Sequence, residues 1–238
     1  MTITDTVCRD FPALNARQGD ILKLVAFAAM VVDHINTASG LNDTLLQAVG
    51  RLAFPLFALV WGYNITRRDV TQKSLNRLWL LALLAQPGFW LAFRHTGVAW
   101  WQVNILFTFA VMGQAVRFMQ ESSLRTAFIS LLALAAYLPI SGASYGLRGL
   151  FLLMICVLFF LTTGRQQILA AAGLAMSVLL LNAPSGGMMM LSGLLLSLIC
   201  LTVTCRQVQS EGRLPAARWF AHLYGLHLTV IGGVLCLI

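Results

Sequence analysis

Long runs of apolar residues follow one another along almost the whole chain, and they constrain its fold more than any other feature. A run of about 17 to 25 mostly apolar residues is long enough to cross a bilayer as one α-helix. Such segments are expected at residues 21–39, 45–65, 76–93, 103–119, 124–140, 147–163, 167–182, 187–204 and 219–237. The sequence therefore predicts an all-α, polytopic helical membrane protein with about nine transmembrane helices. Two short segments, 103–119 and 167–182, are also compatible with re-entrant helices.

The composition supports this class. Hydrophobic residues make up 59% of the chain, charged residues make up 10%, and the mean hydropathy is +0.81, which is outside the range of soluble globular domains. Residues 1–20 are polar and carry five charges, so they lack the pattern of a cleaved signal peptide and are expected to be retained. We expect a single transmembrane domain over residues 1–238, with residues 1–20 as a polar cytoplasmic segment.

The distribution of Lys and Arg predicts the orientation of the bundle. With nine spans, one side of the membrane receives Arg9, Arg17, Lys23, Arg67, Arg68, Lys73, Arg77, Arg117, Arg125, Arg165, Arg206, Arg213 and Arg218. The other side receives only Arg94 and Arg148, and Arg51 lies inside the second span. The positive-inside rule then places the N-terminus in the cytoplasm and the C-terminus outside. This topology accounts for the net charge of +8, so nucleic acid is not an expected partner.

Common catalytic and metal-binding patterns are missing from the sequence. The cysteines are scattered without a C-x-x-C pair, and there is no nucleotide-binding glycine loop, H-E-x-x-H or G-x-S-x-G. We therefore expect no metal site, and we expect any chemistry to use polar groups inside the membrane.

Ionisable residues inside the first two apolar segments are the strongest functional candidates. Lys23, Asp33 and His34 lie in the first segment and Arg51 lies in the second, where a charge is costly unless it has a role. Lys23 and His34 are eleven residues apart, which places them on one helix face about 16 Å apart along the axis. Asp33, His34 and Arg51 are expected in one layer of a helical hairpin. There, Asp33 could fix the tautomer of His34, or form a simple ion pair with Arg51.

Uncharged polar residues in the apolar segments are weaker candidates. They are Asn36, Asn64, Gln86, Asn104, Gln114, Tyr145 and His227, and each could instead hold helices together. His227, which follows Tyr224 in the last segment, is a second candidate proton carrier.

Several blocks of the sequence resemble the TraX proteins of F-type conjugative plasmids. The blocks are residues 23–36 (KLVAFAAMVVDHIN), 50–64 (GRLAFPLFALVWGYN), 76–79 (NRLW), 104–107 (NILF), 141–146 (SGASYG) and 224–228 (YGLHL). The spacing of Lys23 and His34, with the closing Tyr-x-x-His, is more distantly similar to the family-3 membrane acyltransferases. Those enzymes usually carry Arg at the position of Lys23.

The resemblance implies a bacterial inner-membrane enzyme that moves an acetyl group from acetyl-CoA to the N-terminal amine of conjugative pilin. His34 would act as general base, Asp33 would orient it, and Arg51 or Asn36 would donate to the oxyanion. The expected acetyl-CoA-binding residues are Lys23, Arg67, Arg68, Lys73 and Arg77. The expected supporting residues are Asn64, Asn104, Tyr145, Tyr224 and His227. Acetyl-CoA, pilin and membrane lipid are the expected partners.

The same residues also suit other functions. An intramembrane Asp and His with an Arg partner also suits a proton-coupled transporter. A non-enzymatic platform for pilus assembly and an acetyltransferase for a surface sugar are further alternatives. Direct transfer and an acetyl-histidine intermediate are both compatible with the sequence.

Overall fold

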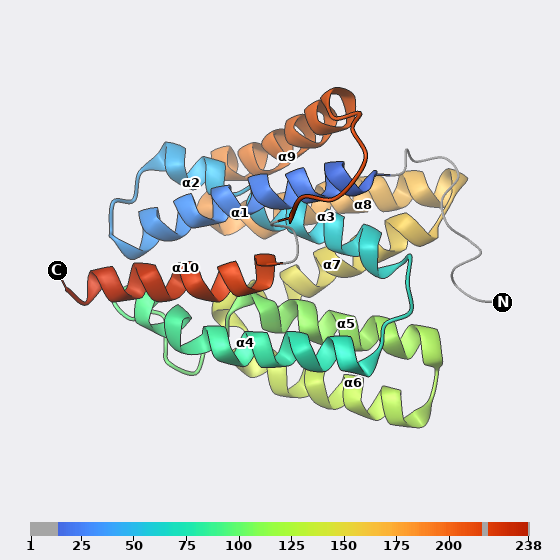
Figure 1. Ribbon diagram of the computed structural model, residues 1–238, viewed down its shortest axis with the longest axis horizontal. Coiled ribbons are helices and arrows are strands. Elements are labelled where there is room, and N and C mark those ends of the chain that lie inside the picture. Colours follow the sequence, from blue (N-terminus) through green and yellow to red (C-terminus); the bar gives the residue numbers. More distant parts are fainter. Residues whose placement is uncertain (1–13, 216–218, 238) are drawn as a thin grey trace.

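The computed structural model describes residues 14–215 and 219–237, and these residues form α-helices and short turns without any β-strand (Figure 1). The helices are α1 (Ala16–Ala38), α2 (Thr44–Gly50), α3 (Ala53–Ile65), α4 (Gln72–Phe93), α5 (Ile105–Glu121), α6 (Leu124–Tyr137), α7 (Gly146–Leu161), α8 (Gly164–Asn182), α9 (Gly187–Gln207) and α10 (Phe220–Leu235). The all-α fold class is confirmed. Residues 1–13 of the predicted polar segment, including Arg9, lie outside the described residues, as does Arg218.

Five helical segments are long and apolar enough to cross a membrane, so the chain is a multi-pass membrane protein. They are Ala16–Ala38, Thr44–Ile65, Gly142–Leu161, Gly164–Ser185 and Gly187–Gln207, and Leu124–Ile140 and His222–Leu235 are shorter apolar helices. Every predicted apolar segment contains a helix. The total of nine spans and the cytoplasmic N-terminus stay predictions.

The second predicted segment, 45–65, is two helices rather than one. Helices α2 and α3 meet at Arg51 and Leu52, and Pro55 explains the break. A proline has no N–H for the carbonyl oxygen of residue i−4, here Arg51, and its ring crowds that oxygen. Arg51 therefore lies at a junction between two helices.

Polar side chains cap the N-terminal ends of several helices. The Asn15 side chain accepts a hydrogen bond from the Gln18 N–H (2.7 Å), and the Asp43 carboxylate accepts from the N–H groups of Leu45 and Leu46 (2.9 Å each). Asn104 caps α5 in the same way by accepting from the Leu106 N–H (3.0 Å). Such caps satisfy backbone donors that a helix start leaves free.

The last helix lies next to the first one. Helix α10 runs between α1 and α4 (Figure 1), and it makes its most extensive contact with α4. Helix α1 also packs on α3, which in turn packs on α7, while α5 pairs with α6 and α7 pairs with α8. This order brings residues from both ends of the chain into one interior.

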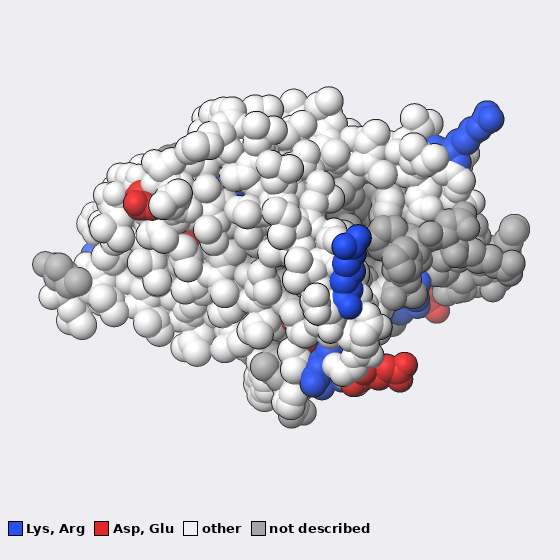
Figure 2. Space-filling model, turned by 90° about the horizontal axis from the view of Figure 1, so that it is seen from above, with Lys and Arg blue, Asp and Glu red and all other residues white. Residues whose placement is uncertain are grey.

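Charged side chains are unevenly distributed over the molecule. The loops after α3, α5 and α7 lie at the end where α1 begins, on the right in Figure 1. On the face in Figure 2, the visible charged side chains lie mainly toward that end, and most of the remaining face is uncharged. This asymmetry agrees with the distribution of Lys and Arg from which we predict the orientation.

Two glycines allow α4 and α10 to approach closely. A Cβ atom at Gly88 would lie 2.6 Å from Thr229 Oγ1 and 3.0 Å from the Thr229 backbone nitrogen. A Cβ atom at Gly232 would lie 2.8 Å from Leu91 Cγ and 2.9 Å from the Ala92 backbone nitrogen. Small residues at helix interfaces in membranes permit this kind of backbone contact.

We expect Gly232→Ala to separate α10 from α4 and to destabilise the protein by about 2 kcal/mol, in the range of overpacking mutations. The measurement is the thermal unfolding of the detergent-purified protein. Gly233→Ala is the matched control, because no atom lies within 4 Å of a Cβ at that neighbouring position. Equal melting temperatures for the two variants would contradict the proposed helix contact.

Candidate active site

A cavity of about 1040 Å³ lies between α1, α3, α4, α5, α10 and the first turn of α7. Helix α1 lines it from Lys23 to Thr37, which is about 21 Å of helix rise. Lys23 and Asn64 line the cavity near the end where α1 begins, and Arg148 and Pro184 line it near the other end. The cavity therefore extends along much of the length of the bundle.

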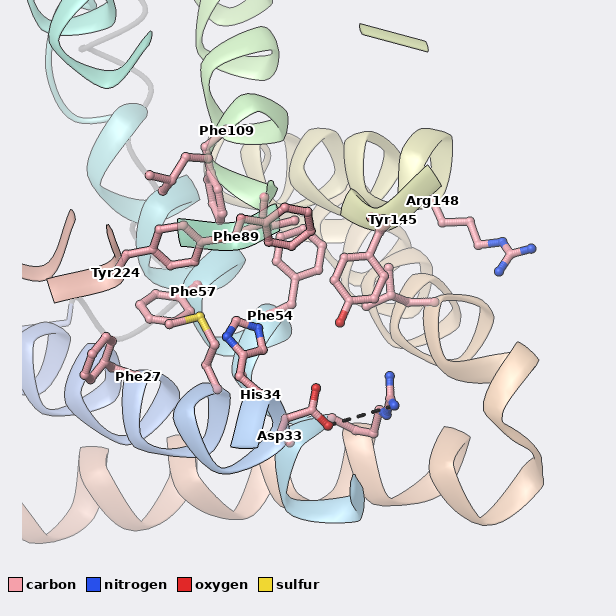
Figure 3. A pocket seen from close by; sticks show the side chains of 18 of the residues that line it. Phe27, Asp33, His34, Phe54, Phe57, Phe89, Phe109, Tyr145, Arg148 and Tyr224 are labelled. Carbon is pink, nitrogen blue, oxygen red and sulfur yellow. Dashed lines mark ion pairs between the residues drawn. The ribbon is translucent and has the colours of Figure 1, made fainter. Parts of the chain in front are cut away.

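Aromatic rings form much of the cavity wall around His34 (Figure 3). The Phe93 ring contacts the His34 ring edge to face, with centroids 5.1 Å apart. The Tyr145 ring stacks on the Phe54 ring at 4.9 Å, and its hydroxyl points toward Asp33 (Figure 3). Tyr145 has a left-handed backbone conformation, with φ of 65°, in the turn that precedes α7. These walls leave only a few polar groups exposed to the cavity.

Asp33 and Arg51 lie together at one side of the cavity, as the sequence predicts. The Arg51 Nη2 atom is 4.0 Å from Asp33 Oδ1, at the limit of an ion pair (dashed line in Figure 3). Gly50 makes this approach possible, because a Cβ atom there would collide with the Asp33 side chain. The pair is loose, since Asp33 Oδ1 and Arg51 Nε are both buried without a hydrogen-bond partner.

Asn182, at the end of α8, adds a third unpartnered atom to this region. Its Oδ1 atom is buried without a partner, while its Nδ2 donates to the Val178 carbonyl (3.0 Å). A Cβ atom at Gly193 would touch both Asn182 Nδ2 and Arg51 Cβ, so Asn182 and Arg51 are neighbours. Buried polar atoms normally have partners, so these three neighbouring atoms can still form hydrogen bonds with a ligand or with water.

The hydrogen bond of His34 is to His227 and not to Asp33, so the expectation that Asp33 fixes the His34 tautomer is wrong. The His34 Nδ1 and His227 Nε2 atoms are 2.8 Å apart, and the two rings are nearly parallel, at 14°. Neighbouring residues of a helix point in different directions, which explains why Asp33 and His34 diverge. The ring partner comes instead from α10.

The second hydrogen bond of His227 determines the proton positions in this pair. His227 Nδ1 is 3.1 Å from the Leu223 carbonyl oxygen, which can only accept, so this nitrogen carries a proton. In a neutral ring His227 Nε2 is then an acceptor, and His34 Nδ1 donates to it. The lone pair of His34 is left on Nε2, and His34 lines the cavity. The arrangement can supply a base to a bound ligand.

Tyr224 also belongs to this part of the site. Its buried ring lines the cavity and contacts the His227 ring edge to face, with centroids 5.4 Å apart. The closing Tyr-x-x-His block of the sequence therefore supplies both a wall of the cavity and the partner of His34.

Asn36 and Asn104 lie outside the cavity lining, and their side chains make structural contacts. Asn36 donates through Nδ2 to the Asp43 carbonyl (2.9 Å) and accepts from the Asp43 N–H (2.8 Å), so its amide closes the turn after α1. Asn104 donates to the Ala82 carbonyl and to Gln86 Oε1, in addition to capping α5. With its Nδ2 engaged by backbone, Asn36 is not placed to donate to an oxyanion.

The predicted basic residues divide into two groups. Lys23 lines the cavity, where its Nζ pairs with Asp20 Oδ1 (2.6 Å) and lies 5.4 Å from the centroid of the Phe220 ring. The other four are exposed in the α3–α4 loop and the first turns of α4, outside the cavity lining; they are Arg67, Arg68, Lys73 and Arg77. Arg67 stacks over the Tyr63 ring at 4.1 Å.

Asn182, Arg148 and Asp20 lie at or near the site and are not among the residues predicted from the sequence. Asn182 and Arg148 are polar residues inside predicted apolar segments, so the criterion that selected Asn64 and Arg51 would also have selected them. Asp20 lies one residue before the first segment, and its carboxylate accepts from the Leu214 N–H (3.0 Å) as well as pairing with Lys23. It thereby ties the α9–α10 connection to α1.

The chain is similar to known proteins over most of its length, and the similar region includes the residues of this site. A family model described as TraX protein matches residues 18–235. A Protein TraX from Escherichia coli is 35% identical over 232 residues, covering 96% of this chain and 92% of the relative. A Protein TraX from Escherichia coli strain K12 is 35% identical over 236 residues, with the same coverage. No solved structure matches the chain. The matches extend from α1 to α10, and the chain belongs to the TraX family.

Proposed function

We propose that this protein is a membrane-bound acetyltransferase that moves an acetyl group from acetyl-CoA to the N-terminal amine of a conjugative pilin, in the bacterial inner membrane. The observation that carries the proposal is the His34–His227 pair, which leaves a basic nitrogen on a residue that lines a long cavity. Membership of the TraX family supports conjugative pilin as the acceptor.

The length of the cavity suits a donor and an acceptor that arrive from opposite sides of a membrane. Acetyl-CoA is made in the cytosol, whereas a pilin amine freed by signal-peptide cleavage lies outside. With the predicted orientation, the pantetheine arm enters beside Lys23 and extends toward His34. The basic α3–α4 loop, with Arg67 and Arg68, then binds the phosphates of the CoA nucleotide at the cytoplasmic surface.

In the proposed reaction, His34 Nε2 removes a proton from the pilin amine as the amine nitrogen attacks the thioester carbonyl carbon. The tetrahedral intermediate then breaks its carbon–sulfur bond, and the proton on His34 passes to the departing CoA sulfur. His227 holds His34 in the required tautomer throughout, so it acts as a positioning residue.

Arg51 is the proposed donor to the oxyanion. Its Nε is a buried donor without an acceptor, and it lies on the same side of the cavity as Asp33 and the Tyr145 hydroxyl. A donor aimed at developing negative charge accelerates acyl transfer most where water is excluded. Asp33 keeps the guanidinium in place through its charge. Asn36 is not included in this mechanism, because its amide is already bonded to Asp43.

Replacement of His34 by Ala should abolish pilin acetylation, because the proposed base is removed; we expect a loss of about a hundredfold or more. Intact-mass measurement of pilin from cells carrying each variant detects the acetyl group. His95→Ala is the control, because this exposed histidine lies outside the cavity lining. Full acetylation with His34→Ala at normal membrane levels would show that the catalytic assignment is wrong.

The role of His227 predicts different effects for two substitutions. Leu removes the acceptor for His34 Nδ1–H, and we expect kcat to fall about 10- to 100-fold, as for other residues that orient a histidine. Gln retains an oxygen acceptor and should keep most of the activity. The measurement is kcat and KM for acetyl-CoA with the purified protein and a pilin peptide. Equal losses with Leu and Gln would contradict the tautomer argument.

The basic loop should affect donor binding rather than chemistry. We expect the double substitution Arg67→Gln and Arg68→Gln to raise KM for acetyl-CoA about two- to tenfold, because exposed charge contacts are weak, while kcat stays nearly constant. Arg125→Gln with Arg165→Gln is the matched control at the same end of the molecule. If the loop variant leaves KM unchanged, the CoA nucleotide does not bind at the α3–α4 loop.

Transfer of labelled acetyl from acetyl-CoA by the purified protein separates this proposal from the alternatives. A proton-coupled transporter or a pilus-assembly platform would transfer no label. A surface sugar that is labelled in preference to the pilin peptide would keep the chemistry and change the acceptor.

A further inference from the structure

A second cavity, of about 710 Å³, lies between α5, α6, α7 and α8, and it differs in character from the one that contains His34. Its walls are almost entirely apolar, with residues such as Val111, Leu134 and Phe151. The hydroxyls of its two serines are already bonded, Ser130 to the Gln114 and Thr126 carbonyls and Ser177 to the Gly173 carbonyl. We call this cavity the α5–α8 groove.

Among the described residues that line the α5–α8 groove, Arg148 is the one with a charge. It is exposed in the first turn of α7, and among the described residues it has no ion pair or hydrogen bond from its side chain. Its side chain points away from the aromatic rings around His34 (Figure 3). The positive end of the α7 dipole lies beside it and also favours an anion.

We infer that the α5–α8 groove binds an anionic glycerophospholipid, with an acyl chain along the apolar walls and the headgroup phosphate at Arg148. The proposal rests on charge complementarity: the apolar α5–α8 groove, with the unpaired cation of Arg148 beside it, matches an apolar chain that carries a phosphate at one end. Guanidinium and phosphate form strong, often bidentate hydrogen bonds. This inference is independent of the acetyltransferase proposal.

The volume of the groove suits an acyl chain and is too small to enclose a transmembrane helix of another protein. A helix about 10 Å wide that rises about 1.5 Å per residue occupies roughly 120 Å³ per residue, so the groove encloses the volume of only about six helical residues. A spanning helix needs about 20 residues. An acyl chain is much thinner than a helix and can lie along the α5–α8 groove.

The position of Arg148 links the lipid site to the first cavity. Leu147 and Arg148 line both cavities, so a phosphate at Arg148 lies at the rim of the cavity that contains His34. A bound lipid would therefore cover one side of that rim and partly neutralise its positive charge.

The experiment is native mass spectrometry of the detergent-purified full chain, titrated with phosphatidylglycerol or with phosphatidylcholine of the same acyl chains. We expect phosphatidylglycerol to bind about tenfold more tightly. Arg148→Gln should remove this preference, and Ala127→Phe, which fills the groove, should weaken the binding of both lipids. The matched controls are Arg94→Gln, at the same end of the molecule, and Ala136→Phe, on an exposed part of α6.

Three outcomes would overturn the inference. Equal binding of the two lipids to the unmodified protein would mean that no anion site exists. A preference that survives Arg148→Gln would place the phosphate elsewhere. A photo-crosslinking residue at Leu131, in the groove wall, that forms adducts with a polypeptide instead of lipid in membranes would show that a protein helix occupies the groove.

Discussion

The close contact between α4 and α10 determines the rest of the arrangement. Gly88 and Gly232 allow the two backbones to touch, and this places α10 between α4 and α1. Only in that position can His227, near the end of the chain, reach His34, near its beginning. A polar contact within a bilayer depends on such packing because the hydrophobic effect does not draw helices together there.

The polar groups of the interior fall into two kinds with different roles. Most are satisfied, as Asn36 is by Asp43 and Asn104 is by Ala82 and Gln86, and these groups hold turns and helices in place. Asp33 Oδ1, Arg51 Nε and Asn182 Oδ1 are the exceptions among the described residues, and they lie near one another. An unsatisfied buried polar group costs free energy, so their concentration beside the cavity supports a ligand-binding role.

Much of the site could be predicted from the cost of placing polar side chains in lipid. That cost pointed to Lys23, Asp33, His34, Arg51 and Tyr145, and all of them line the same cavity. The same argument also selected Asn36 and Asn104, because the cost of burial is the same whether a backbone group or a ligand satisfies the amide. We predicted Asp33 as the partner of His34 because the two residues are adjacent in the sequence. Adjacent residues of a helix point in different directions, so the two side chains do not meet.

The sequence by itself determined the helical class, the apolar segments and the uneven distribution of basic residues, since these follow from composition and local order along the chain. The break between α2 and α3 was also encoded locally, in Pro55. Only the tertiary structure decided that the first and last helices are neighbours, that His227 determines the tautomer of His34, and that Arg148 lies between two cavities. These features join residues far apart in the chain, and helices of similar hydropathy carry little local information about which neighbour they will contact.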